Sequence, residues 1–346
     1  MSKIVRGALA AERRGVFVGS LASLAERYPE VAARTGSIVA AELAKSVKGD
    51  KFKSIPVFCN KQWCECPDKE RGLAVYVPEG VSAGEKITIH VGGVGTRVDK
   101  HNCRNVIVVE EGASAFIEVR YAGGLCECGR LAEVWLGRGA SLETVTFFEG
   151  EESEAVIEGT TIVRCDEDAD YRSTVAASGV KSFADNTKVI LAGKGARATV
   201  NGAAVGRGDS KIECNTIIEH ASADTTSSQL FRAAAGDSSL VRFCGRIYVA
   251  PGADRIEAYQ QNNNVLLSER ARAVAEPRLE IYADDVKCSH GSTVGQLSEE
   301  ALFYMRQRGI SEEEARKLLV EGFIGEVFAM MGDAVLADRL ADRMRL

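Results

Sequence analysis

Apolar and polar residues follow a repeated pattern through the middle of the chain. A short run rich in β-branched or aromatic residues leads into a polar turn that ends in a small residue and then alanine, and a second such run follows. The turn pairs, which recur every 27 to 30 residues, are Ser82-Ala83, Gly112-Ala113, Gly139-Ala140, Asp168-Ala169, Gly195-Ala196, Ser222-Ala223 and Gly252-Ala253. Short strands are therefore expected from about residue 72 to residue 290.

The regular spacing of these turns favours a mainly β fold of the solenoid type. Each repeat is too small to bury its own apolar face, and stacked neighbours would bury it together. No long helical pattern separates the strands, so alternating strand–helix units are not expected. A β-sandwich also has short strands at regular spacing. The narrow spread of the period favours the solenoid, in which small turn residues let successive coils lie close.

The N-terminal segment has helical periodicity instead. In GSLASLAERYPEVAARTG, the residues Leu21, Leu24 and Ala25 fall on one face, and Pro29 is expected to end the turn. This predicts a helical segment within residues 1–50, ahead of the solenoid core.

Two more helices are predicted after residue 297. Ser298 opens the segment SEEALFYMRQRG, and Ser311 with Glu314 forms a capping box for the next helix. One apolar face of that helix consists of Ala315, Leu318, Leu319, Gly322, Phe323 and Phe328. Part of this stripe is expected to cap the open end of the solenoid, and the rest could dock a partner. The chain thus divides into residues 1–50, a β core over 51–297, and a C-terminal helical segment over 298–346.

Composition and charge narrow the class of protein. The chain of 346 residues carries a net charge of −6, which argues against general nucleic-acid binding. No apolar run approaches the roughly 18 residues that span a bilayer, and the first residues show no secretory signal. We therefore expect a cytoplasmic protein without a membrane partner. Its ten cysteines are then expected to be core residues, metal ligands or sulfur carriers rather than disulfides.

One short segment, YADDVKCSHGSTVG, places a cysteine and a histidine two residues apart. In a strand, Cys288 and His290 would share a face, about 7 Å apart at Cα. Both can bind iron or zinc, but a stable site usually needs four ligands. A second chain related by a two-fold axis would complete the set. The alternative is a partly buried cysteine beside a hydrogen-bonded histidine.

Other cysteines carry weaker signals. Cys64 and Cys66 form one C-x-C pair, and Cys126 and Cys128 form another about two repeats later, so a shared metal site is a hypothesis. Neither pair has the C-x-x-C spacing of zinc ribbons. Cys165 follows an arginine, and a neighbouring cation would lower the pKa of its thiol and make it a better sulfur nucleophile.

An enzyme is the competing class. Some β-solenoids act on carbohydrates with groove carboxylates, and Asp284-Asp285 is the best acidic pair in this sequence. Neighbouring strand residues face opposite sides, which suits an acid/base couple poorly. The Walker A and H-E-x-x-H sequences are absent.

A long C-terminal stretch resembles the SufB/SufD family of iron–sulfur cluster assembly proteins. It reads LEIYADDVKCSHGSTVGQLSEEALFYMRQRGISEEEARKLL, and the similarity continues upstream through YQQNNNVLLSE and through a segment whose His220, Thr226 and Ser228 match an H…T-x-S pattern. The resemblance covers about residues 15 to 330. The N-terminal helical region is shorter than that of the SufD branch.

The resemblance implies a right-handed parallel β-helix flanked by helices, without enzymatic activity of its own. It implies pairing with a second, identical or homologous chain, and binding of the SufC ABC-type ATPase through the C-terminal helices. The ATPase would bind the nucleotide, and the anchors expected here are Phe303, Tyr304 and Phe323. A sulfur donor would supply a transient iron–sulfur cluster of unspecified type, built near the pairing interface.

The branch within the family stays open. Cys288 and His290 match the C-S-H-G motif of SufD, whereas the cluster residues of SufB fall on Ala271 and Gly291 here. Cys165 lies close to the position of the first sulfur acceptor of SufB. The chain could therefore contribute cluster ligands, or it could be a purely structural SufD-like partner that holds the ATPase.

Overall fold

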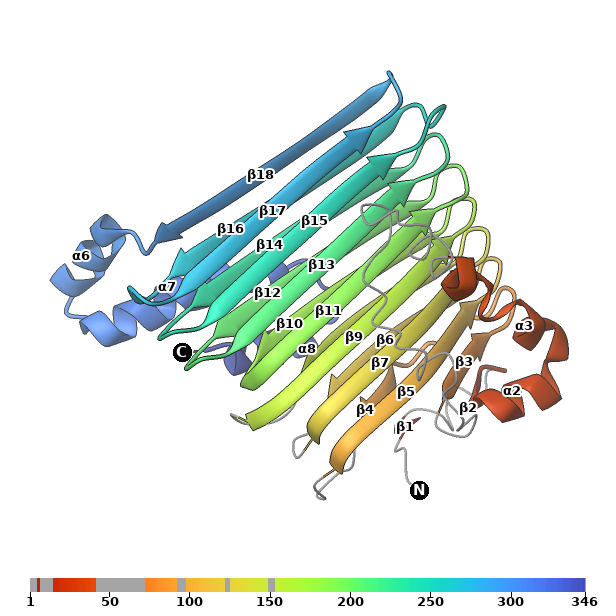
Figure 1. The fold of residues 1–346 in the computed structure, drawn as a ribbon, viewed down its shortest axis with the longest axis horizontal. Coiled ribbons are helices and arrows are strands. Elements are labelled where there is room, and N and C mark those ends of the chain that lie inside the picture. The colour runs from red at the N-terminus through yellow and green to blue at the C-terminus, as the bar shows by residue number, and fades with distance from the viewer. Residues whose placement is uncertain are drawn as a thin grey trace.

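The computed structural model describes residues 5–6, 15–41, 72–91, 98–121, 125–148 and 153–345. Two nine-stranded sheets face each other and form a parallel β-solenoid (Figure 1). The chain alternates between the sheets, so each strand pairs with the strands two before and two after it. This confirms the predicted solenoid and excludes the sandwich.

The strands of the two sheets have the following bounds. One sheet runs in the order β1 (Val5–Arg6), β4 (Ile87–Val91), β6 (Ser114–Tyr121), β8 (Ser141–Phe148), β10 (Asp170–Ser178), β12 (Arg197–Gly206), β14 (Thr226–Ala235), β16 (Ile256–Leu266) and β18 (Val286–Gln296). The other runs in the order β2 (Phe17–Ser20), β3 (Leu73–Val77), β5 (Val98–Val109), β7 (Leu125–Leu136), β9 (Ser153–Cys165), β11 (Val180–Leu191), β13 (Lys211–His220), β15 (Leu240–Val249) and β17 (Arg272–Ile281). We call them the even and the odd sheet, after the numbers of their solenoid strands.

The recurrent turns join the odd sheet to the even sheet. Six of the seven predicted alanines are buried there, which lets the coils stack closely. Ala223 is only half-buried, because the turn before β14 is longer than its sequence suggested. Asp224, with φ of +60°, and the fully buried Thr225 occupy the equivalent positions.

Short elements close the N-terminal end of the solenoid. β1 pairs antiparallel with β4, and β2 pairs antiparallel with β3. Helices α2 (Leu21–Arg27) and α3 (Pro29–Arg34) follow β2, and their Leu24 and Val31 pack with β3 and β5. Pro29 therefore starts a second helix instead of ending the helical segment, as its fixed φ suits a first helical position. The predicted boundary at residue 50 lies outside the described residues.

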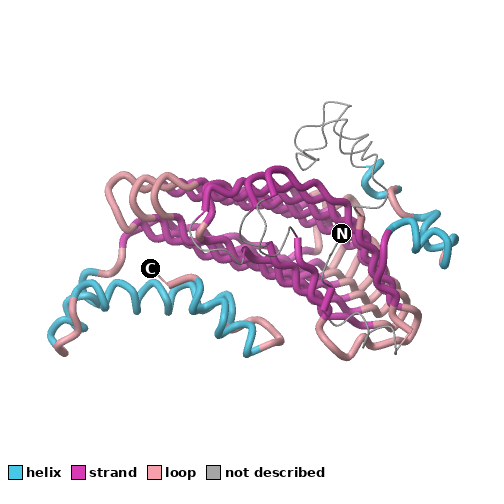
Figure 2. Tube along the Cα trace, turned by 90° about the horizontal axis from the view of Figure 1, so that it is seen from below, coloured by secondary structure: helices cyan, strands magenta, loops and turns pink. Residues whose placement is uncertain are grey.

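Of the three C-terminal helices, the second and third lie along the outer side of the even sheet, and the first packs on the second (Figures 1 and 2). They are α6 (Glu299–Gln307), α7 (Glu312–Phe328) and α8 (Ala334–Arg343). Ser298 and Ser311 cap α6 and α7 as predicted, since their hydroxyl oxygens accept from the N–H groups of Ala301 and Glu314.

The predicted cap over the open end of the solenoid is wrong. The face of α7 that is buried includes Val320, Ile324 and Val327, which contact outward residues of the even sheet such as Phe147. Leu318, expected in the buried stripe, is exposed. The helices therefore leave the C-terminal end of the solenoid uncovered. In the described part of the chain, no helix is both long and apolar enough to cross a membrane.

Candidate functional site: the open end of the solenoid

The last coil of the solenoid consists of β17 and β18, and we call this end the mouth. In the described chain, each of these strands pairs with a neighbour on one side only. Apolar side chains are left partly in solvent here, including Val274, Ile281, Tyr282 and Val294. An edge of this length with exposed apolar groups is typical of a surface that another strand covers.

Cys288 and His290 lie in the mouth, on β18. The register places Cys288 beside Ala258 and His290 beside Gln260, both of which face the solenoid interior. Cys288 packs against the small apolar cluster that contains Ala258, and His290 is exposed. Because alternate strand residues share a face, both side chains are on the inner side of the edge strand. The predicted same-face geometry is confirmed.

The thiol of Cys288 is not activated in the single chain. Partial burial raises its pKa, and a backbone hydrogen bond from Ala258 offsets this only in part. Among the described residues, no three His, Cys, Asp or Glu side chains come together as a metal site. The mouth therefore offers two potential ligands, and metal binding would have to displace the thiol proton.

The strand that carries these residues is held by its neighbour. Lys287 forms an ion pair with Glu257 at 2.9 Å, across the ladder between β18 and β16. Lys287 pairs with Glu257 and not with Asp285, because residues two apart along an extended chain are farther from each other than cross-strand neighbours.

Cys165 does not have the chemistry predicted for it. It is fully buried in the apolar interior, and burial raises the pKa of its thiol. Arg164 faces outward and pairs with Asp166 at 3.3 Å, because sequence neighbours on a strand point to opposite faces. The expectation of a thiolate stabilised by Arg164 is therefore wrong.

The C-x-C pairs do not form a described site. Cys64 and Cys66 lie outside the described residues, and only the backbone of Cys126 is described. Cys128 points into the solenoid interior, where burial raises the pKa of its thiol. A buried protonated thiol in an apolar core is a packing residue, so the structure gives the shared metal site no support.

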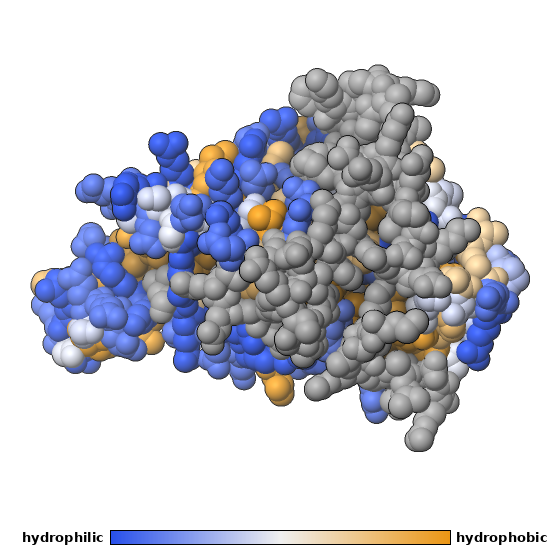
Figure 3. Space-filling model, turned by 60° about the horizontal axis from the view of Figure 1, so that its bottom comes forward, coloured by the Kyte–Doolittle hydropathy of each residue, from blue (hydrophilic) through white to orange (hydrophobic). Residues whose placement is uncertain are grey.

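The three predicted ATPase anchors differ in accessibility. Phe303 and Tyr304 on α6 are 61% and 56% exposed, and Tyr304 lies under the guanidinium of Arg308. Phe323 on α7 packs against the even sheet and beneath Arg232. We call α6, α7 and α8 the helical arm. It is mostly hydrophilic on the face shown at the left of Figure 3. Phe303 and Tyr304 are therefore exposed aromatic residues on a mostly hydrophilic segment.

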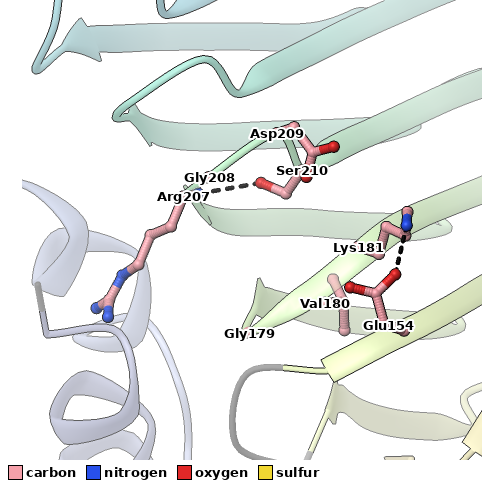
Figure 4. Close-up of a pocket in the computed structure, with 8 residues that line it drawn as sticks. All are labelled: Glu154, Gly179, Val180, Lys181, Arg207, Gly208, Asp209 and Ser210. Carbon is pink, nitrogen blue, oxygen red and sulfur yellow. Dashed lines mark hydrogen bonds and ion pairs between the residues drawn. The ribbon is translucent and has the colours of Figure 1, made fainter.

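A shallow hollow of about 330 Å³ lies elsewhere, at the turns between strands (Figure 4). Its lysine, Lys181, is paired with Glu154, and the backbone N–H of Arg207 donates to the hydroxyl of Ser210 at 3.0 Å. None of the predicted site residues lines it. Because its charges are already paired within the chain, we assign it no function.

The sequence of the solenoid and of the first helices after it was compared with known proteins. Residues 94–323 match the family model described as "SUF system FeS cluster assembly, SufBD core domain". The chain belongs to the SufBD family. The match covers the strands from β5 to β18, with the mouth, and continues into α7.

Curated SufBD relatives come from distant organisms. The Escherichia coli iron-sulfur cluster assembly protein SufD is 34% identical over 159 residues, which is 46% of this chain and 38% of that protein. Protein ABCI7, chloroplastic, of Arabidopsis thaliana is 28% identical over 286 residues, 79% of this chain and 60% of that protein. A SufBD family protein of Methanothermobacter thermautotrophicus is 24% identical over 236 residues, 67% of this chain and 57% of that protein. The chain thus spans between about two fifths and three fifths of the length of these relatives.

Two features of this SufBD chain escaped the sequence interpretation. His220 is fully buried, and its ring nitrogens bond the hydroxyls of Thr225 at 2.8 Å and Ser227 at 2.9 Å. The neighbouring Thr226 and Ser228, which the motif suggested, face outward. Gln229 and Gln260 face inward near the mouth. Side chains along a strand alternate between the inner and the outer face. Once the apolar positions show which residues face inward, this alternation would have identified the partners of His220 and the two glutamines.

Proposed function

We propose that this chain is a non-enzymatic scaffold subunit of iron–sulfur cluster assembly that pairs through its mouth with a second SufB/SufD-type chain. One observation supports this most: within the described residues, the two long strands β17 and β18 each have one side on which no strand pairs, and Cys288 and His290, whose side chains can bind a metal, lie on the inner face of β18. An exposed strand edge next to an incomplete ligand set is what a shared site between two chains requires.

The cargo of that shared site is a transient iron–sulfur cluster. Cys288 and His290 would supply half of a four-ligand set, and the second chain would supply the rest. Because the thiol pKa of Cys288 is raised, the cysteine would bind weakly before pairing. Such a site stays open until both chains meet, which suits a cluster that is built from an external sulfur donor and then passed on.

The test compares cluster content in three variants. The chain is purified anaerobically with its family partner and a SufC-type ATPase, and iron and acid-labile sulfide are measured per complex. Cys288→Ser and His290→Ala should each retain less of both than the wild type. Cys244→Ser removes a half-buried thiol on the outer face of β15, beside β17, and should match the wild type. Equal cluster content in all four proteins would make the chain a purely structural SufD-like partner.

The helical arm is proposed to bind the SufC-type ATPase. Exposed aromatic rings on a helix are suitable anchors for a groove on another protein, and losing such an anchor often costs about 2 kcal/mol or more. Phe303→Ala and Tyr304→Ala should weaken co-purification with the ATPase. Val335→Ala, at a fully accessible position on α8, should leave it unchanged.

The expected role of Phe323 differs from that of the two exposed rings, because its ring contacts Arg232 and the even sheet. We expect Phe323→Ala to lower the stability of the arm, and to weaken ATPase binding only as a consequence. Wild-type co-purification by Phe303→Ala and Tyr304→Ala, with normal circular dichroism, would rule out α6 as the docking element.

A further inference from the structure

The interior of the solenoid contains buried amide side chains close to the mouth. In the last coils the inward residues include Gln229 on β14 and Gln260 on β16, each 2% exposed. The strand register places Gln229 beside Gln260, and Gln260 beside His290. The three side chains therefore form a column that ends at the exposed histidine.

Among the described residues, Gln260 is the member of this column with no partner for either amide atom, and Gln229 lacks one only for its amide nitrogen. Both its amide nitrogen and its amide oxygen are buried and unpaired, whereas the nearby Asn264 donates to Asn262 at 2.7 Å and to the carbonyl of Thr293 at 3.1 Å. Buried amides nearly always have partners, so an unpaired one beside a potential ligand calls for an explanation.

The space around this amide is made by a glycine. A side chain at Gly245 on β15 would place its Cβ 1.9 Å from Nε2 of Gln260. Below Gln260, the hydroxyl of Thr216 donates to Oε1 of Gln229 at 2.5 Å, so that oxygen is already engaged. The unpaired atoms of Gln260 lie in the coil directly before the one that carries His290.

We propose that Gln260 is a positioning residue for His290: when the exposed ring of the histidine turns toward it, the unpaired amide oxygen of Gln260 accepts the ring N–H. A neutral imidazole that binds a metal through one nitrogen keeps a proton on the other, and an acceptor for that proton fixes both the tautomer and the orientation of the ring. A neutral amide does this without adding charge to the site. The metal-binding consequence rests on the proposed function, whereas the contact itself does not.

The decisive measurement is the tautomer of His290. The full chain is labelled with ¹⁵N-histidine, and ring nitrogen shifts are recorded at about pH 8.5, above the ordinary imidazole pKa. The chain has four histidines, so His290→Ala assigns the signal. The wild type should show one dominant tautomer, and Gln260→Leu should show a mixture. Gln261→Leu, at the exposed neighbour on the outer face of β16, should match the wild type.

Two further variants separate positioning from folding. Gln260→Met, which keeps the length of the side chain but lacks the amide, should give the mixture even if Gln260→Leu folds poorly. Gln260→Glu, which keeps an acceptor, should restore one tautomer. A mixture in the wild type, or one dominant tautomer in Gln260→Met, would overturn the proposal.

Cobalt binding tests the link to the site. Co²⁺ is titrated into the full chain and followed by its visible absorption. Gln260→Met should bind about 10 to 100 times more weakly than the wild type, and Gln261→Leu should be unchanged. If His290→Ala binds Co²⁺ like the wild type while the tautomer still depends on Gln260, the ligand role of His290 is refuted and the contact stands.

Discussion

The two ends of the solenoid are finished in different ways. At the N-terminal end, short antiparallel strands lie against both sheets, and Phe17 of β2 is buried with Tyr28 of α3's N-terminal flank. At the C-terminal end, β17 and β18 have 10 and 11 residues, and one side of each strand is unpaired in the described part of the chain. Long uncovered edges promote association. The difference agrees with our proposal that the mouth is the pairing surface.

The pairing of buried polar groups also differs along this axis. In the earlier coils the buried Arg130 donates to the hydroxyls of Tyr121 and Thr161, whereas in the last coils Gln260 has no partner among the described residues. Buried amides stabilise a core only when every donor and acceptor is paired. The mouth is therefore the part of the molecule that gains most when a second chain or a ligand arrives.

The largest expected effect tests the closed end. Phe17→Ala should lower the free energy of unfolding by about 3 kcal/mol or more, because it removes a buried aromatic side chain and leaves a cavity. Val294→Ala at the mouth, where the side chain is 47% exposed, should change it by less than about 0.5 kcal/mol. Urea unfolding of the single chain measures both. Equal losses would mean that the mouth also supports the monomer.

The stacked coils could be predicted because the apolar period and the small turn residues are local signals. The direction in which a side chain points was harder to predict, because it depends on which strand residues face inward. Arg164 and Cys165 are adjacent in sequence but point to opposite faces. Similarly, Thr225 rather than Thr226 contacts His220. The location of α7 could not be inferred, since an apolar stripe does not specify which surface covers it. That choice depends on contacts with Phe147 and other residues far away in the sequence.

The second prediction concerns pH and uses the buried histidine as a counterpart to the exposed one. Burial lowers the pKa of His220 to about 4, from an ordinary value near 6.5. Between these values the unfolded chain binds the proton and the folded chain does not, so stability should fall as the pH drops from about 6.5 to about 4. The loss from this one group is about 3 kcal/mol.

His220→Asn provides the control for that prediction. It removes the titrating ring, so the difference between wild type and variant should change across the interval from about pH 6.5 to about pH 4 and be constant above it. Chemical denaturation at several pH values measures this difference. A difference that is independent of pH would show that His220 is not held neutral in the folded chain.

The third prediction tests the mouth as an interface. Val294→Arg should weaken pairing with the second chain by about 30-fold, the equivalent of ~2 kcal/mol, because a charge would be buried against the partner. The fold should be unaffected, since the side chain is already half in solvent. Analytical ultracentrifugation of the mixed chains gives the affinity. Val335→Arg on α8 is the matched valine control, and equal weakening by both would argue against the mouth.

The smallest expected effect is a difference in alkylation rate between the buried and the half-buried cysteines. Cys165 and Cys214 are buried in the interior, and Cys244 and Cys288 are half-buried with raised pKa values. Alkylation at about pH 8 should therefore modify Cys244 and Cys288 slowly, and the two interior thiols only after unfolding. Adding the second chain should slow Cys288 several-fold and leave Cys244 unchanged, because only Cys288 lies in the mouth. Mass spectrometry of peptides over time measures each rate. Protection of Cys244 instead of Cys288 would move the interface from the open end to the outer face of the odd sheet.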